Sequence, residues 1–221
     1  MGHALFEHAD FLVAARDLAA EHGPAGVTVG SVTERLKAPK GSFYYRFASR
    51  DLLLGEVWLA IVLAFQEGFV AAIEAGDGLA AALHTPAWVR SNLDDARLLL
   101  LYHRDDFVQG EWPAPLKRGV ADQARRFEAC FARFARDAFG RVGADELRLA
   151  QFVLADVPGA AIRPHLRRRE TPPPMIDDLV RVTYRAVVDG HRRGGLVSGA
   201  RRPKGRSPAR TRLASRGGKS P

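Results

Sequence analysis

The sequence predicts an all-α protein, with three short helices at the N-terminus followed by a larger helical bundle. Apolar residues recur at spacings of three and four along most of the chain, as they do on one face of a helix. No segment between residues 50 and 194 shows the alternating pattern of a strand. The predicted units are residues 1–50, residues 51–194 and a C-terminal stretch, residues 195–221.

The first predicted helix ends at Gly23 and Pro24, because glycine caps helices and proline cannot continue them. Its apolar stripe comprises Phe11, Leu12, Ala15, Leu18 and Ala19. A second helix begins at Thr28, whose hydroxyl can accept a hydrogen bond from an otherwise unpaired backbone N–H. Its inward positions are Val29, Val32 and Leu36.

A third helix follows a turn that Pro39 imposes, since proline forces the residue before it into an extended conformation. Phe43 and Phe47 are four residues apart and share its buried face. The residues left outside are Lys40, Ser42, Tyr44, Tyr45 and Arg46. This basic, hydroxylated and aromatic face suits phosphates, base edges and thymine methyl groups. The alternative is that the two tyrosines are half-buried packing residues.

Residues 11–53 resemble the DNA-binding domain of the TetR family of transcriptional repressors, on the segment TVGSVTERLKAPKGSFYYRF at 28–47 and its flanks FLVAARDLAAEHG and ASRDLL. This layout is a helix-turn-helix, whose second helix enters the DNA major groove. The resemblance implies that Lys40 and Tyr44 contact DNA, that Tyr45 contacts phosphate at a position where the family usually has His, and that Arg50 is the family's phosphate-contacting basic residue. The DNA-binding set is Thr28, Lys40, Gly41, Ser42, Tyr44, Tyr45, Arg46 and Arg50.

Three residues depart from the family pattern. Lys37 stands where the turn usually has Gly, so we expect a non-glycine residue at positive φ. Pro39 replaces the usual Ser or Thr cap of the third helix. Gly30 occupies a position that often carries a long polar side chain reaching DNA, which predicts less readout by the second helix.

Composition predicts a soluble protein in a reducing compartment. No apolar run approaches the length of a membrane span, and the N-terminal ten residues lack the basic start and long apolar stretch of a signal peptide. The single cysteine cannot form an intramolecular disulfide. We expect the bacterial cytoplasm as its location, in association with the nucleoid.

The net charge of +8 comes from the C-terminal stretch. Residues 195–221 hold eight of the 33 cations and no acid, which leaves residues 1–194 formally neutral. This stretch is rich in Gly, Pro, Ser and Arg, and its composition predicts a disordered basic tail. The tail either adds nonspecific DNA affinity by counterion release or does nothing specific.

The bundle is expected to begin with one long connecting helix, residues 51–75, that ends at Gly76-Asp77-Gly78. Further helices are predicted at 79–83, 87–92, 95–107, 116–139, 145–168 and 175–193, with a loop at 110–115. Pro86 is expected in the first turn of the helix at 87–92, and the helix at 145–168 is expected to be bent or broken at Pro158.

This number of helices resembles the effector-binding and dimerisation domain of TetR proteins, in which the last two long helices form a four-helix bundle with their symmetry mates. The implied interface residues are Leu149, Phe152, Val153, Leu179, Val182, Tyr184 and Val187, although each could pack only within its own subunit.

The many aromatic residues of the bundle predict an apolar ligand cavity. The candidates are Trp58, Phe65, Trp88, Tyr102, Phe107, Trp112, Phe127, Phe131 and Phe134, with His103, Asn92 and Gln66 as polar anchors. For any one of these residues the alternative is an ordinary place in the core.

No catalytic, metal or cofactor site is expected. The pairs Asp94-Asp95 and Asp105-Asp106 diverge by about 100° on a helix and make poor metal clamps. Cys130 lies on an aromatic face and is expected to be buried. No Cys/His metal spacing, P-loop or nucleophile elbow occurs.

The predicted function is a ligand-responsive repressor that binds a palindromic DNA operator as a homodimer and is released by a small hydrophobic molecule. The alternative is a helical small-molecule binding protein without specific DNA recognition, which the Lys37 and Gly30 departures would favour. Turnover of a substrate by the purified protein would indicate a helical enzyme. Binding of DNA regardless of its sequence would indicate a basic architectural protein.

Overall fold

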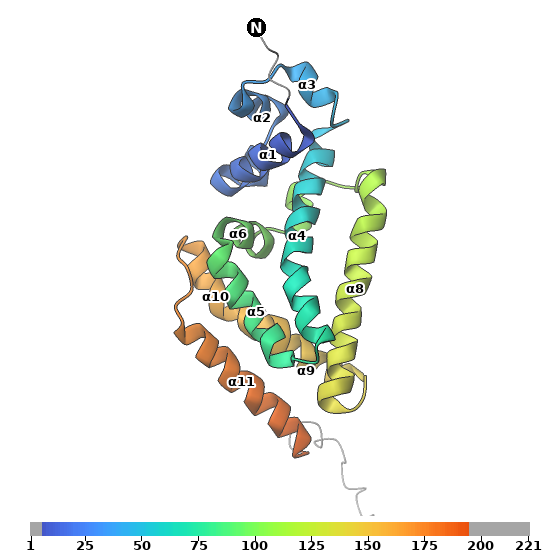
Figure 1. Ribbon diagram of the computed structural model, residues 1–221, viewed down its shortest axis with the longest axis vertical. Coiled ribbons are helices and arrows are strands. Elements are labelled where there is room, and N and C mark those ends of the chain that lie inside the picture. Colours follow the sequence, from blue (N-terminus) through green and yellow to red (C-terminus); the bar gives the residue numbers. More distant parts are fainter. Residues whose placement is uncertain (1–5, 195–221) are drawn as a thin grey trace, which may run out of the picture.

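The computed structural model describes residues 6–194, and all regular structure in that range is helical (Figure 1). The predicted all-α fold is therefore confirmed, whereas the predicted tail at 195–221 lies outside the described residues. The elements in chain order are α1 (His8–His22), η1 (Pro24–Gly26), α2 (Val29–Leu36), α3 (Lys40–Tyr44), α4 (Arg50–Glu74), α5 (Gly78–Ser91), α6 (Leu93–Leu101), α7 (Arg104–Phe107), α8 (Ala114–Phe139), α9 (Ala144–Gln151), η2 (Phe152–Asp156), α10 (Val157–Arg167) and α11 (Met175–Arg192).

Helices α1, α2 and α3 form a compact unit at one end of the molecule (Figure 1). Gly23 ends α1 with φ of 78°, and the Thr28 hydroxyl caps α2 by accepting from the Ser31 backbone N–H at 3.0 Å. Lys37 ends α2 in the left-handed region, with φ of 54°. Each of these features follows the expectation from sequence.

An aromatic cluster holds the three helices together. Phe11, Phe43 and Phe47 are fully buried, and their ring centroids lie 5.6–6.1 Å apart. The same core continues into Leu54 of α4 and into Phe107 of α7. The N-terminal unit is thus packed directly onto the bundle, and a domain boundary at residues 50/51 remains a prediction.

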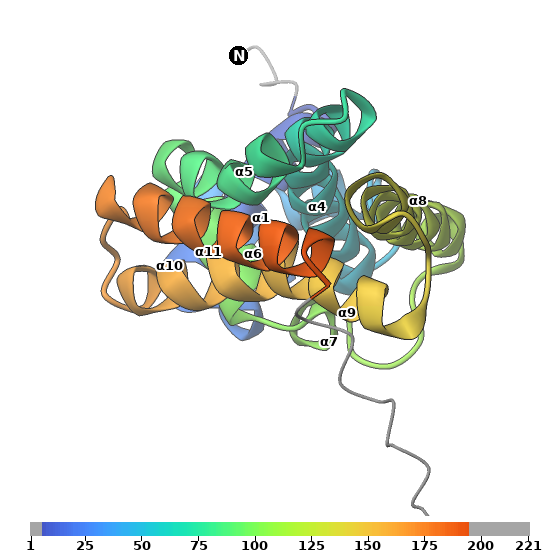
Figure 2. The same cartoon turned by 90° about the horizontal axis from the view of Figure 1, so that it is seen from below.

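Helix α4 runs from the N-terminal unit through the centre of the bundle (Figures 1 and 2). Ser49 caps it by accepting from the Leu52 N–H at 3.1 Å. With a mean hydropathy of 1.7 over its most apolar window, α4 is the one helix of the described residues long and apolar enough to cross a membrane by length and composition, which corrects the expectation that no run approaches a span. Helix α4 packs against α1, α5 and α8, and 39% of this window is buried within the described residues.

One predicted break in the bundle is absent, and one break was not predicted. Pro86 is buried inside a continuous α5, where a break was expected before it. The predicted helix at 95–107 is instead α6 and α7, which are separated at Tyr102 and His103. The side chain of Asp106 accepts from the His103 backbone N–H at 2.6 Å, and this capping contact starts α7.

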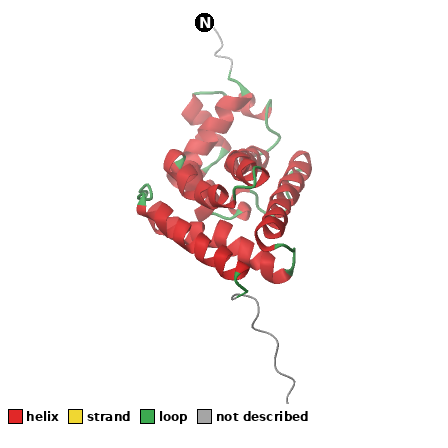
Figure 3. Ribbon diagram, turned by 60° about the horizontal axis from the view of Figure 1, so that its bottom comes forward, coloured by secondary structure: helices red, strands yellow, loops and turns green. Residues whose placement is uncertain are grey.

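Helices α10 and α11 form an antiparallel pair across the end of the bundle (Figures 2 and 3). The predicted helix at 145–168 is continuous through α9, η2 and α10, and η2 is a π-helical segment just before Pro158. Proline has no N–H for the preceding turn, and the helix adjusts ahead of it instead of breaking. Helix α11 packs against α5 and α10.

Candidate functional site

The exposed face of α3 lies at the tip of the N-terminal unit. Lys40 and Gly41 are exposed, Tyr44 is 61% exposed and Tyr45 is 86% exposed. Phe43, from the same helix, is fully buried below them. The aromatic core therefore fixes the backbone of α3, while its cation and its two phenol groups project outward. Such an arrangement is suited to contact with a nucleic acid groove.

The remaining residues of the predicted DNA-binding set are more constrained. The Arg46 guanidinium donates to the Ser42 carbonyl at 3.1 Å and lies over the rings of Phe11 and Tyr45, 5.6 Å from each centroid. Thr28 is exposed at the start of α2, with its hydroxyl engaged in the cap. The side chains of both residues are therefore engaged in contacts within the N-terminal unit.

Arg50 does not project toward the exposed face as expected for a phosphate contact. Its Nε donates to the Val27 carbonyl at 2.6 Å and an Nη donates to the Pro24 carbonyl at 2.7 Å, while the other Nη pairs with Asp51 at 2.9 Å. The side chain thereby ties the start of α4 to the turn between α1 and α2. A sequence motif could not reveal these partners, because two of them lie more than 20 residues away.

We expect Arg50→Ala to lower the free energy of unfolding by about 2–3 kcal/mol, since hydrogen bonds to a charged donor contribute more than neutral ones. Arg50→Lys should be nearly as destabilising, because an ammonium cannot reach both carbonyls in the same geometry. Urea unfolding followed by circular dichroism measures this loss. If Arg50→Lys keeps full stability and Arg50→Ala lowers only the salt dependence of DNA binding, Arg50 contacts phosphate and is not a structural clamp.

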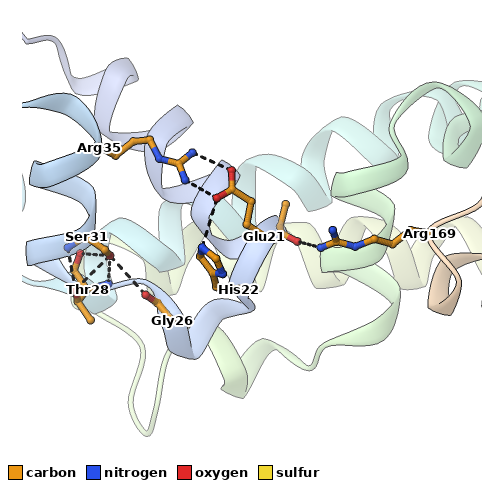
Figure 4. A network of polar contacts seen from close by, with 8 residues as sticks. Glu21, His22, Gly26, Thr28, Ser31, Arg35 and Arg169 are labelled. Atoms are coloured by element: carbon orange, nitrogen blue, oxygen red, sulfur yellow. Dashed lines mark hydrogen bonds and ion pairs between the residues drawn. The ribbon is translucent and has the colours of Figure 1, made fainter.

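Polar contacts also connect the N-terminal unit internally and to the bundle (Figure 4). Arg35 of α2 donates to both carboxylate oxygens of Glu21 in α1, and these hydrogen bonds lower the pKa of Glu21 below its ordinary value. Arg169, from the connection between α10 and α11, donates to the Ala20 carbonyl of α1 at 2.8 Å. Arg16 of α1 pairs with Asp95 of α6. His8 of α1 also contacts Glu56 of α4, at 2.6 Å, so three polar contacts join α1 directly to the bundle.

A cavity of about 280 Å³ lies inside the bundle, between α4, α5, α6, α8 and the continuous helix formed by α9, η2 and α10. Three predicted aromatic residues and one predicted polar residue line it: Trp58, Phe65, Phe127 and Gln66. The other lining residues are Val62, Phe69, Thr85, Leu99, Leu100, Gln123, Leu154, Ala155 and Gly159. Helical periodicity identified the aromatic faces but could not show which of them border empty space.

The other predicted ligand-binding residues lie elsewhere. Trp88 packs edge-on against Phe65 at 5.3 Å, and Phe131 packs against Phe127 at 5.1 Å, but neither residue lines the cavity. Phe107 and Tyr102 belong to the core shared with the N-terminal unit, together with Trp112. His103 is exposed at the start of α7 and Asn92 joins α5 to α6, donating to the Trp88 carbonyl at 3.0 Å, while Phe134 packs with Tyr184 at 6.0 Å.

The predicted dimer residues fall into three groups, which are exposed, fully buried and partly buried. Phe152, Leu179 and Val182 are exposed, and so is Met175, which the sequence reasoning missed. Val153 is only 1% exposed and belongs to the core, which corrects its assignment to an interface. Leu149, Tyr184 and Val187 are partly buried against the same core.

Within residues 6–194 no group of three or more His, Cys, Asp and Glu residues is placed to hold a metal ion. Cys130 is buried, and burial raises the pKa of its thiol.

Comparisons with known proteins address the N-terminal unit and the fold separately. Residues 11–57 match the family model of the bacterial regulatory proteins of the tetR family. A solved structure from Mesorhizobium loti, described as that of a TetR-family transcriptional regulator, is 14% identical to the chain, with a TM-score of 0.54, and the match covers 84% of this chain and 95% of that one. At this identity the match demonstrates a common fold. No curated protein matches the sequence.

Proposed function

The chain belongs to the TetR family, and we propose that it is a ligand-responsive repressor that binds a palindromic operator as a homodimer. The observation that carries the proposal is the exposed face of α3, where Lys40, Tyr44 and Tyr45 project from a helix fixed by Phe43 and Phe47. In a dimer, two such helices about one DNA turn apart would read the two halves of an inverted repeat. The protein would act in the bacterial cytoplasm, at the nucleoid.

The route from ligand to DNA is proposed to run through α4. The first turns of this helix belong to the core of the N-terminal unit, and its middle supplies Trp58, Phe65 and Gln66 to the cavity. A ligand that favours one position of α4 would change the spacing of the two recognition helices and release the operator by population shift. The Arg169–Ala20 and Arg16–Asp95 contacts would transmit movement of the bundle to α1.

The first test is footprinting of the purified full chain on the DNA upstream of its own gene, with excess nonspecific competitor at physiological salt. A protected inverted repeat supports the proposal. The contrary result is protection that disappears under competitor, with no specific site recovered by a genome-wide selection. The cavity is then the feature that indicates function, and the protein is a small-molecule binding protein without specific DNA recognition.

Two substitutions on α3 are expected to weaken DNA binding in different ways. Tyr44→Ala should raise the operator Kd about 10- to 100-fold and leave nonspecific binding unchanged, as expected for loss of a base contact. Lys40→Ala should weaken binding to all sequences and reduce the slope of log K against log salt by about 1, as expected for loss of a phosphate contact. Titrations at several salt concentrations separate the two signatures, and equal behaviour of the two variants would contradict these roles.

A further inference from the structure

Two polar side chains that line the cavity in the bundle make no hydrogen bond to the described part of the chain. Gln66 of α4 and Thr85 of α5 are each 4% exposed, and both line the cavity. Neither side chain makes a hydrogen bond within residues 6–194, and neither is among the fully enclosed polar atoms without a partner, which are Arg97 Nε, Trp112 Nε1 and His191 Nδ1. The polar atoms of Gln66 and Thr85 are therefore accessible from the cavity that both residues line. A polar side chain buried without a partner is unfavourable, and native proteins rarely leave one so.

The other buried polar side chains provide a direct comparison. Thr33 donates to the Val29 carbonyl at 2.9 Å, and Glu146 accepts from Arg141 at 2.7 Å. Both are as deeply buried as Gln66 and Thr85, and neither lines the cavity. Of these four buried polar residues, the two away from the cavity have hydrogen-bond partners among the described residues, and the two that line the cavity have none.

The rest of the lining is uncharged. Every other lining side chain is apolar or aromatic except Gln123, and no ionisable side chain lines the cavity in the described part of the chain. His84 packs on the Phe65 ring at 5.2 Å, and burial lowers its pKa and favours the neutral imidazole. A charged ligand would lose its hydration here without meeting an opposite charge.

The volume limits the size of the ligand. A cavity of about 150 Å³ is known to admit benzene, and this one has about twice that volume. It therefore suits a bicyclic aromatic molecule of about a dozen non-hydrogen atoms.

We propose that the cavity binds an uncharged aromatic molecule of this size whose polar end carries a neighbouring hydrogen-bond donor and acceptor, as a carboxamide does. The amide of Gln66 offers the complementary acceptor and donor, and the Thr85 hydroxyl supplies a further partner. This assignment names the ligand class of the proposed effector site and so rests on the proposed function.

The test uses three probes of equal size: 2-naphthamide, 2-naphthoate and 2-isopropylnaphthalene. Isothermal calorimetry on the full chain without DNA measures the three Kd values. We expect 2-naphthamide to bind about tenfold more tightly than the apolar probe and at least a hundredfold more tightly than the carboxylate. In Gln66→Leu the tenfold preference for the amide over the apolar probe should disappear, while Gln109→Leu, an exposed site outside the cavity, should retain it.

Several results would overturn the assignment. They are binding of none of the three probes, binding of the carboxylate as tightly as the amide, or an unchanged amide preference in Gln66→Leu. Circular dichroism verifies the fold of the variant, and the order of affinities in the parent chain tests the proposal even if that variant fails to fold. Because footprinting is done without ligand, failure of this inference and failure of DNA recognition are observed separately.

Discussion

Phe47→Ala is expected to lower the free energy of unfolding by about 3–5 kcal/mol, the usual effect of removing a buried phenylalanine. Phe47 is fully buried, and its ring lies 5.6 Å from Phe43, 6.1 Å from Phe11 and 4.3 Å from the imidazole of His8. Collapse of this cluster would release α3 from α1, because the contacts of Phe43 and Phe47 are what fix α3. Urea unfolding measures the loss, which is a large part of the 5–15 kcal/mol typical of a folded protein.

Tyr45→Ala is the matched control for Phe47→Ala, since it removes an aromatic ring two residues away. Tyr45 is almost fully exposed, so its removal should change stability by less than about 0.5 kcal/mol. The two variants together separate the role of the buried face from that of the exposed face. Equal destabilisation by both would mean that Tyr45 is a packing residue and that the proposed DNA-contacting face is wrongly assigned.

The N-terminal unit could be predicted closely because its determinants are local. The Thr28 cap, the Pro39 turn and the four-residue spacing of Phe43 and Phe47 each act within a few residues of one another, and the structure contains all three. Positive φ at Lys37 was also predictable from the requirements of the turn.

The features that sequence did not reveal depend on contacts between distant segments. Arg50 resembles a phosphate-binding residue until the Pro24 and Val27 carbonyls are placed beside it. Pro86 stays inside α5 because the helix is packed on α4, α10 and α11, and tertiary packing overrides the local preference of proline to end a helix. Val153 and Phe152 are neighbours in sequence, yet one lies in the core and the other is exposed.

The same limitation applied to the cavity. The sequence identified the aromatic faces of α4 and α8, but not which of their side chains would border empty space. Gln66 was one polar residue among three candidates. Its deep burial in the cavity lining, with no hydrogen-bond partner among the described residues, distinguishes it from His103 and Asn92.

The outer surface of α11 is the best-supported candidate for the dimer interface. Met175, Leu179 and Val182 are 62%, 51% and 67% exposed, and their spacings of four and three residues place them on one stripe. The opposite side of the helix is already occupied by Ile176, Val180 and Val188, which pack in the core of the bundle. Two apolar sides on one helix are expected when the second side meets another subunit.

Replacing Leu179 and Val182 together by Glu is therefore expected to convert the protein to a monomer, because both stripes would carry charges facing each other across the two-fold axis. Operator affinity should fall by about 10²–10⁴-fold, since the two half-sites would no longer be bound by one linked pair of recognition helices. Sedimentation equilibrium measures the association state, and titration of the operator measures the affinity. Arg185→Glu introduces a glutamate at an exposed position of α11 away from the stripe and should leave the dimer intact.

If the double variant remains dimeric with unchanged operator affinity, the subunits associate through another surface. If it becomes monomeric but binds the operator as before, recognition does not require the dimer, and the proposal of a palindromic site read by two coupled helices is wrong.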